Sequence, residues 1–184
     1  MKSLITKKIR NLTAITIHVM LASMLTIPVN AEANESSPTY DLNLDRLPEF
    51  NLEVLDHNFS ITNDAMKGNY YLIYFWGTSC KSCIEEMPYL HDTYEEFRDE
   101  NFEILSVAAD QNIESIEEYR KVYPMPWLHT IIGKDDYTMA EVTSKFRIQK
   151  WPQKFLVSPE GELLESFKGF TGEKLKEQVS EHLE

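Results

Sequence analysis

The chain has 184 residues, of which 18 are basic and 30 are acidic, and its formal net charge is −12 at pH 7. Such a surface repels nucleic acid and anionic lipid, which argues against both as partners and indicates a well-solvated protein. Once an N-terminal leader is set aside, the length suits one compact domain.

Residues 1–31 have the layout of a secretory signal peptide. A basic start with three lysines and an arginine precedes an apolar stretch from Leu12 to Val29, and a cleavage site follows at Ala31. The apolar stretch is nearly long enough to span a bilayer, so an uncleaved membrane anchor is the alternative. Because polar residues and Pro28 interrupt this stretch, we expect cleavage.

The next segments predict a lead-in and the first strands of the folded domain. Residues 32–47 are polar and predict a flexible lead-in, so the domain is expected to span residues 48–184. Apolar and polar residues then alternate around Asp56-His57-Asn58, which predicts a short β-hairpin. The apolar and aromatic run Tyr70–Trp76 is typical of a strand buried on both faces.

Strand and helix patterns alternate downstream of this run. Apolar residues at steps of three and four predict an amphipathic helix from Ile84 to Phe97, with Pro88 inside it. Further strands are predicted over 102–109, 127–132, 154–158 and 162–169, and further helices over 113–122, 137–146 and 172–183. This order indicates an α/β fold in which helices flank a mixed central β-sheet.

Two cysteines, Cys80 and Cys83, lie directly after the predicted 70–76 strand. A disulfide between them would close too short a loop to stabilise the fold appreciably. Cys80 falls at the strand end and Cys83 in the first turn of the next helix, where unpaired N–H groups favour an anion. We therefore expect Cys80 to ionise more readily than a free thiol, and the pair to open and close as a redox-active disulfide.

A metal site is the competing interpretation of the two cysteines. A structural zinc site needs four ligands, but the sequence has no second cysteine pair and its histidines are scattered. Two thiolates and a histidine such as His129 could hold Cu(I), so a copper-binding assembly factor stays as an alternative function. We expect no bound metal and no cofactor other than the Cys80–Cys83 disulfide.

The stretch "FWGTSCKSCIEEMP" resembles the active-site segment of thioredoxin-fold proteins, and more closely that of the exported TlpA/ResA/DsbE-like thiol–disulfide oxidoreductases. Upstream, "PEFNLEVLD" is similar to the N-terminal hairpin of that branch. Downstream, "FRIQKWPQKFLVSPEGEL" is similar to its cis-proline loop and last hairpin. The resemblance covers about residues 48–184 and implies a thioredoxin-like fold with an N-terminal β-hairpin extension.

The resemblance also implies roles for individual residues. Cys80 would be the exposed nucleophile and Cys83 the buried resolving thiol. Pro152 would be a cis-proline packed against the disulfide, and the backbone of Trp151 would pair with a strand of the client protein. Trp76, from the aromatic pair ahead of the motif, would support the site.

The chain departs from the family pattern at three places in this site. One is Ser79, where an aromatic residue often precedes the first cysteine. The buried acid of thioredoxins would fall at Tyr74, so Asp110, after the next strand, becomes the candidate proton shuttle. Its alternative role is to cap the helix that begins at Ile113. Relatives usually carry proline between the cysteines, where this chain has Lys81-Ser82, so their redox potential cannot be transferred to it.

The function implied by the resemblance is that of a thiol–disulfide oxidoreductase exported to the periplasm. Its usual direction in this branch is reduction of protein disulfides, including those of apocytochrome c, with electrons from a membrane thiol donor of DsbD type. The clients would be exported proteins with cysteines or disulfides. A disulfide oxidase or isomerase is the alternative direction. A peroxiredoxin-type peroxidase is excluded because Ile73 and Gly77 replace its required proline and threonine.

Overall fold

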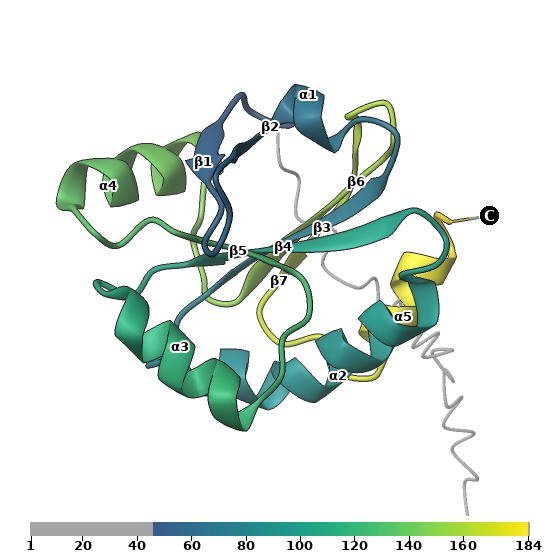
Figure 1. Ribbon diagram of the computed structural model, residues 1–184. Helices are drawn as coiled ribbons and strands as arrows, with labels where there is room; N and C mark the ends of the chain where they lie inside the picture. Colours follow the sequence, from purple (N-terminus) through teal and green to yellow (C-terminus); the bar gives the residue numbers. More distant parts are fainter. Residues whose placement is uncertain (1–45, 184) are drawn as a thin grey trace, which may run out of the picture. The chain divides into compact units, whose positions relative to one another are not determined.

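A five-stranded mixed β-sheet lies at the centre of the computed structural model, which describes residues 46–183 (Figure 1). The strands in sheet order are β5 (Leu128–Ile131), β4 (Phe102–Ala108), β3 (Tyr70–Trp76), β6 (Gln153–Val157) and β7 (Leu163–Lys168). The first three are mutually parallel, while β6 runs antiparallel to β3 and β7 antiparallel to β6. Parallel neighbours require crossover connections, which the intervening helices supply.

Separate hydrophobic clusters cover the two faces of this sheet, and β3 contributes to both. Its residues alternate between the clusters: Leu72, Tyr74 and Trp76 on one face, and Tyr71, Ile73 and Phe75 on the other. The first cluster includes side chains of α2 (Lys81–Phe97), α3 (Ile113–Val122) and α5 (Lys174–Ser180). The second includes side chains of α4 (Asp136–Lys145) and of the hairpin β1 (Asn51–Glu53) and β2 (Ser60–Thr62). Burial on both faces explains why β3 is a continuous apolar run.

The predicted fold class is confirmed, including the N-terminal hairpin. The hairpin forms around Asp56-His57-Asn58, and the strand at 70–76 and the helix at 113–122 have the predicted bounds. The other ends shift by a few residues at most. A one-turn helix, α1 (Asn63–Met66), was not predicted, because four residues are too few to show a helical period.

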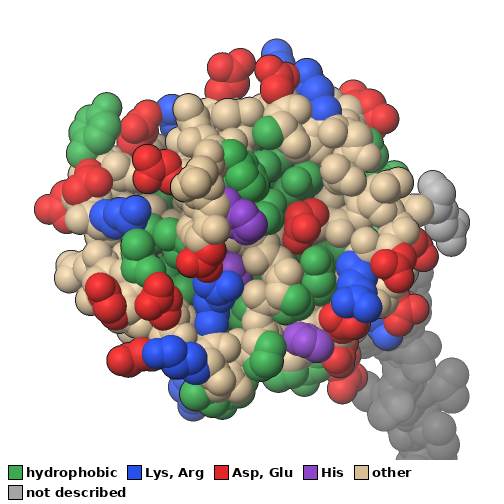
Figure 2. Space-filling model, in the orientation of Figure 1, with side chains coloured by type: hydrophobic (Ala, Val, Ile, Leu, Met, Phe, Trp, Pro, Cys, Tyr) green, Lys and Arg blue, Asp and Glu red, His purple; other side chains and the backbone are tan. Residues whose placement is uncertain are grey.

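The acidic composition appears directly on the surface. Figure 2 shows Asp and Glu side chains spread over one face, with Lys and Arg side chains mostly beside them. The exposed pairs include Lys67–Asp64, Arg98–Glu95 and Lys145–Glu141. Pairs exposed in this way contribute little to the stability of the fold.

The predicted signal peptide (1–31) lies outside the described residues, as does most of the predicted lead-in (32–47). Leu47, the last residue of that lead-in, is already buried in the second hydrophobic cluster. Between residues 46 and 183, no helix has the length and apolarity needed to cross a membrane.

Candidate active site

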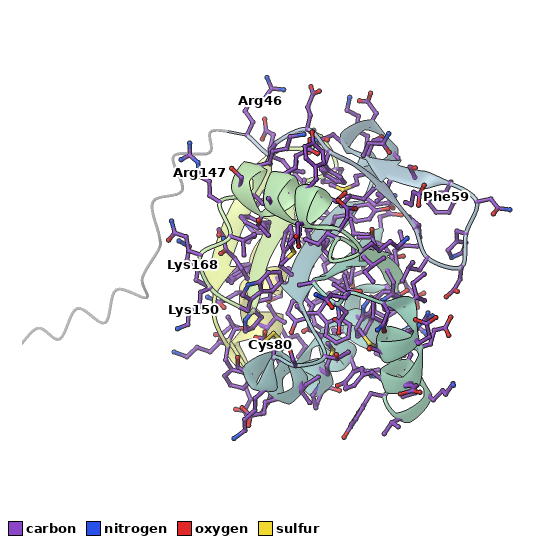
Figure 3. All side chains as sticks on the ribbon, turned by 90° about the vertical axis from the view of Figure 1, so that its left-hand side faces the viewer. Arg46, Phe59, Cys80, Arg147, Lys150 and Lys168 are labelled. Atoms are coloured by element: carbon purple, nitrogen blue, oxygen red, sulfur yellow. A yellow bond between two sulfur atoms is a disulfide. The ribbon has the colours of Figure 1, made fainter. Side chains whose placement is uncertain are left out.

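The two cysteines lie where β3 gives way to α2. The loop Gly77–Ser79 connects these elements, Cys80 is the N-cap residue of α2, and Cys83 lies in its first turn. A disulfide joins the two sulfurs, with the Cα atoms 5.2 Å apart. Cys80 is partly exposed and lies in the lower part of the molecule in Figure 3, whereas Cys83 is fully buried. The sequence-based placement of both cysteines is therefore confirmed.

The start of α2 provides a hydrogen-bond donor to Cys80. The backbone N–H of Cys83 donates to the Cys80 Sγ over 3.2 Å, in the way that a polar side chain caps a helix. When the disulfide opens, the same N–H and the positive end of the helix would stabilise a thiolate at Cys80. Lys81 adds little, because it is exposed and pairs with Glu85 at 3.6 Å.

Ser82, inside the cysteine motif, links Cys80 to the opposite loop, a contact that the sequence did not predict. Its Oγ lies 3.6 Å from the Cys80 Sγ and donates to the carbonyl oxygen of Trp151 over 3.5 Å. The Trp151–Pro152 peptide bond is cis, as the resemblance implies. The loop before β6 is thus next to the partly exposed sulfur.

The two tryptophans near the site have different environments. Trp151 is partly exposed and packs edge-on against Phe75, with the ring centroids 6.3 Å apart. Trp76 is fully buried and packs against Tyr119 in the first hydrophobic cluster. Trp151 is therefore accessible at the surface, whereas Trp76 lies within the core, and the roles predicted for both residues stay predictions.

Asp110 holds the loop that precedes Cys80. Its carboxylate accepts a hydrogen bond from the backbone N–H of Thr78 at 3.0 Å and another from the Thr78 hydroxyl. The alternative role predicted for Asp110, as a helix cap, is wrong, because Asn112 caps α3 by accepting from Ser115 N. The proton-shuttle role of Asp110 stays a prediction.

A buried ion pair lies beneath the cysteines, and sequence reasoning missed it. Lys154 Nζ donates to both carboxylate oxygens of Glu86 at 2.8 Å and to the Gly169 carbonyl at 2.9 Å. Glu86 also accepts from the N–H and the hydroxyl of Thr171, at 2.7 and 2.6 Å. Both charged side chains are fully buried. The cluster therefore joins α2 to β6 and to the loop before α5.

Tyr74 lies where thioredoxins would have a buried acid, and it connects this ion pair to the cysteines. Its hydroxyl donates to the Cys83 carbonyl over 3.1 Å, and the Lys154 Nζ lies 5.8 Å from the centre of its ring. Burial raises the pKa of Tyr74 well above its ordinary value, so the hydroxyl stays protonated and keeps donating.

His129, the residue considered for copper, is occupied inside the core. Its Nδ1 lies 2.6 Å from the Ser106 hydroxyl and its Nε2 lies 3.0 Å from the Met125 carbonyl. Because a carbonyl accepts only, Nε2 carries the proton and Nδ1 accepts from Ser106. Both ring nitrogens are engaged, which removes the sequence-based reason for a copper site at His129.

The burial of His129 predicts a loss of stability in mild acid. Burial lowers the pKa of His129 from 6.5 to about 4, so between these values the unfolded chain takes up a proton that the native protein excludes. Stability should then fall as the pH drops from about 6.5 toward 4, by at most roughly 3 kcal/mol from this residue. Urea unfolding of the oxidised protein at pH 7, 6 and 5 measures the loss. The variant His129→Asn should show a shallower dependence, whereas the exposed-site control His57→Asn should follow the unmodified chain. Parallel curves for all three proteins would contradict the prediction.

Comparisons with known proteins agree with this geometry. A family model described as thioredoxin-like matches residues 68–163, more than half of the chain. The chain is 30% identical over 117 residues to the thiol-disulfide oxidoreductase ResA of Bacillus thuringiensis subsp. konkukian. The matched region covers 64% of this chain and 63% of that relative. It is 28% identical over 138 residues to ResA of Geobacillus kaustophilus, with 74% of each chain covered. The chain therefore spans less than two thirds of the length of the first of these curated relatives.

Solved structures show the same relationship. The thioredoxin domain of a thiol-disulfide oxidoreductase from Bacteroides vulgatus matches with a TM-score of 0.68 at 29% identity, covering 76% of this chain and 96% of that domain. The family match, the shared architecture and the cysteine pair at the start of α2 show that the chain belongs to the thioredoxin-like family, with ResA-type thiol–disulfide oxidoreductases among its relatives.

Proposed function

We propose that the protein is an exported thiol–disulfide oxidoreductase that reduces protein disulfides through Cys80 and Cys83. The observation that carries the proposal is the unequal burial of the two sulfurs. Cys80 is partly exposed and has a backbone N–H directed at its sulfur, whereas Cys83 is fully buried. One cysteine can therefore meet a client disulfide, and the other can be reached only from within the protein.

The reaction consists of two thiol–disulfide exchanges. The Cys80 thiolate attacks one sulfur of the client disulfide, which breaks the client S–S bond, forms a mixed disulfide and releases a client thiolate. The Cys83 thiolate then attacks the Cys80 sulfur, which breaks the mixed disulfide and releases the second client thiolate. The client gains two electrons and two protons, and the protein is left with the Cys80–Cys83 disulfide. A dithiol donor must reduce it before the next cycle.

The source of those electrons and the location of the protein form part of the same proposal. The signal-peptide layout of residues 1–31 supports export to the periplasm. The resemblance to the TlpA/ResA/DsbE-like branch supports a membrane thiol donor of DsbD type and clients such as apocytochrome c. The redox group is the disulfide itself, without a metal or another cofactor.

The direction of electron flow can be tested by measuring the reduction potential of the Cys80–Cys83 couple against glutathione. Thioredoxin, a reductant, lies near −270 mV, and the oxidant DsbA lies near −120 mV. We expect a value in the reducing half of this range, together with reduction of insulin by the dithiol form.

A potential above about −150 mV would instead assign the protein as an oxidase. Elemental analysis of the reduced, desalted protein provides an independent check of the metal alternative. One tightly held metal ion per chain would replace the redox proposal with a metal-binding function, because two thiolates alone leave a zinc tetrahedron half empty.

A further inference from the structure

Three basic side chains on one side of the molecule stand out in so acidic a protein. Arg147, Lys150 and Lys168, here called the cationic strip, lie along the left-hand side of the molecule in Figure 3. Most other Lys and Arg side chains shown by the structure pair with a carboxylate. Within residues 46–183, neither Arg147 nor Lys150 forms an ion pair. Their charge is therefore available to a partner.

Contacts within the protein place part of this strip beside the active site. Lys150 directly precedes the Trp151–Pro152 cis bond. The Lys150 side chain also packs beside Gly169, since a Cβ placed on that glycine would lie 3.4 Å from the Lys150 Nζ. The Gly169 N–H in turn donates to the Pro152 carbonyl over 2.7 Å. Trp151, the neighbour of Lys150, accepts a hydrogen bond from the Ser82 hydroxyl through its carbonyl oxygen. That hydroxyl lies 3.6 Å from the Cys80 sulfur, so the strip begins next to the nucleophile.

The strip continues away from the cysteine on two segments. Lys168 pairs with Gln153 in the β6–β7 ladder, and its Nζ donates to the Gln149 side chain over 2.9 Å. Gln149 lies between Arg147 and Lys150 on the loop that joins α4 to β6. The basic side chains of this loop and of β7 therefore lie on the surface next to the cis-proline.

Protection of an edge strand accounts for only one residue of the cationic strip, Lys168. A lysine near the end of an edge strand such as β7 hinders pairing between molecules, but Arg147 and Lys150 lie outside β7. Arg147 has a φ of 50°, a left-handed conformation in which glycine or asparagine is the ordinary choice after a helix. Neither backbone geometry nor strand protection therefore explains an arginine at this position.

We propose that the cationic strip docks an acidic segment next to the client's reactive cysteine, so that the preferred substrates are disulfides flanked by Asp and Glu. This inference rests on the proposed reductase function and adds a substrate class to it. Elsewhere the net charge of −12 repels an acidic client, so the strip both steers the client and orients it toward Cys80. The attraction is screened over about 10 Å at 0.1 M salt, which makes it measurable.

The test uses three peptides that share one disulfide and differ only in acidic, neutral or basic flanks. The reduced full-length protein is mixed with each, and the second-order rate of peptide reduction is followed at low and high salt. We expect the acidic peptide to react on the order of tenfold faster than the neutral one at low salt, and the basic peptide to react more slowly. High salt should abolish most of these differences.

Matched variants locate the effect. The double variant Arg147→Ser/Lys150→Ser should reduce the ratio of the acidic to the neutral rate to about threefold or less. The control Lys121→Ser/Lys174→Ser also removes two exposed charges that form no ion pair within residues 46–183. In this control the ratio of the acidic to the neutral rate should stay unchanged. The inference would be overturned if both double variants lowered the ratio of the acidic to the neutral rate equally. It would also be overturned if that ratio were near one in the unmodified chain.

Three further results would overturn acidic-client docking, and they differ in what they say about the reductase function and about membrane binding. If the neutral peptide is reduced normally but flanking charge has no effect, the acidic-client inference fails and the reductase function stands. If no peptide is reduced, both fail. If the Arg147→Ser/Lys150→Ser variant loses binding to phosphatidylserine vesicles while the ratio of peptide rates stays unchanged, the strip recognises a membrane, and the proposal is overturned.

Discussion

The variant Cys83→Ser is expected to accumulate covalent complexes with client proteins, because it can carry out the first exchange but not the second. Cys80 is partly exposed and still attacks the client disulfide, whereas the buried sulfur that would release the client is absent. Multiple turnover should be almost completely lost. Incubation with insulin, followed by electrophoresis without reductant, would show the complexes, and dithiothreitol should release them.

The matched variant Cys80→Ser distinguishes the roles of the two cysteines. It keeps Cys83, but this thiol is fully buried and cannot reach a client, so no complex should form. In Cys83→Ser, the Cys80 thiol should also react with iodoacetamide at neutral pH faster than free cysteine, because the N–H at residue 83 and the helix start stabilise its thiolate. A reversed trapping pattern would reverse the assignment of nucleophile. If neither variant trapped a client and both still reduced insulin, the assignment of Cys80 and Cys83 as the redox centre would be wrong.

The parts of this site that could be predicted from the sequence depend on local patterns. The apolar run Tyr70–Trp76 and the helical stripe after it fix where a strand ends and a helix begins, and Cys80 and Cys83 lie across that boundary. Proline after an aromatic residue, together with the family resemblance, indicated the cis bond before Pro152. Such features involve neighbouring residues, so one sequence is enough to recognise them.

The polar contacts that support the site could not be predicted in this way. Asp110 and Thr78 are 32 residues apart, and Lys154 and Glu86 are 68 residues apart. Their contacts depend on the order of strands in the sheet, which places β6 beside β3 and pairs Lys154 with Tyr74. One signal was present, since Glu86 falls on the same buried helix face as Cys83 and Leu90. A charged residue on an apolar face requires a partner.

This arrangement makes the ion pair part of the structure that supports Cys83. Tyr74 donates to the Cys83 carbonyl, Lys154 lies over the Tyr74 ring, and Glu86 follows Cys83 by about one helical turn. The buried charges therefore help to fix the first turn of α2 against the sheet. A substitution at the ion pair should therefore lower the free energy of unfolding, whether or not it changes the sulfur chemistry.

The largest loss of stability is accordingly expected for Lys154→Met, which leaves the Glu86 carboxylate buried without its cation. Glu86 would keep only the two donors of Thr171, and removal of one partner of a buried pair typically costs roughly 3–5 kcal/mol. That is a large share of the roughly 5–15 kcal/mol that stabilises an ordinary domain. Urea unfolding of the oxidised protein at pH 7 measures the change. The control Lys150→Met, at an exposed lysine four residues earlier, should change the free energy of unfolding by less than about 0.5 kcal/mol.

The double variant Glu86→Gln/Lys154→Met tests whether the charge left behind causes this loss. A glutamine keeps an oxygen to accept from Thr171, but neither side chain of the double variant is charged. Because uncharged replacements of both partners are tolerated far better than removal of one, the double variant should recover most of the stability lost in Lys154→Met. If its loss instead equals that of Lys154→Met plus that of Glu86→Gln, the two residues act independently. The pair would then stabilise the protein through packing and separate hydrogen bonds, and not through the meeting of opposite charges in the core.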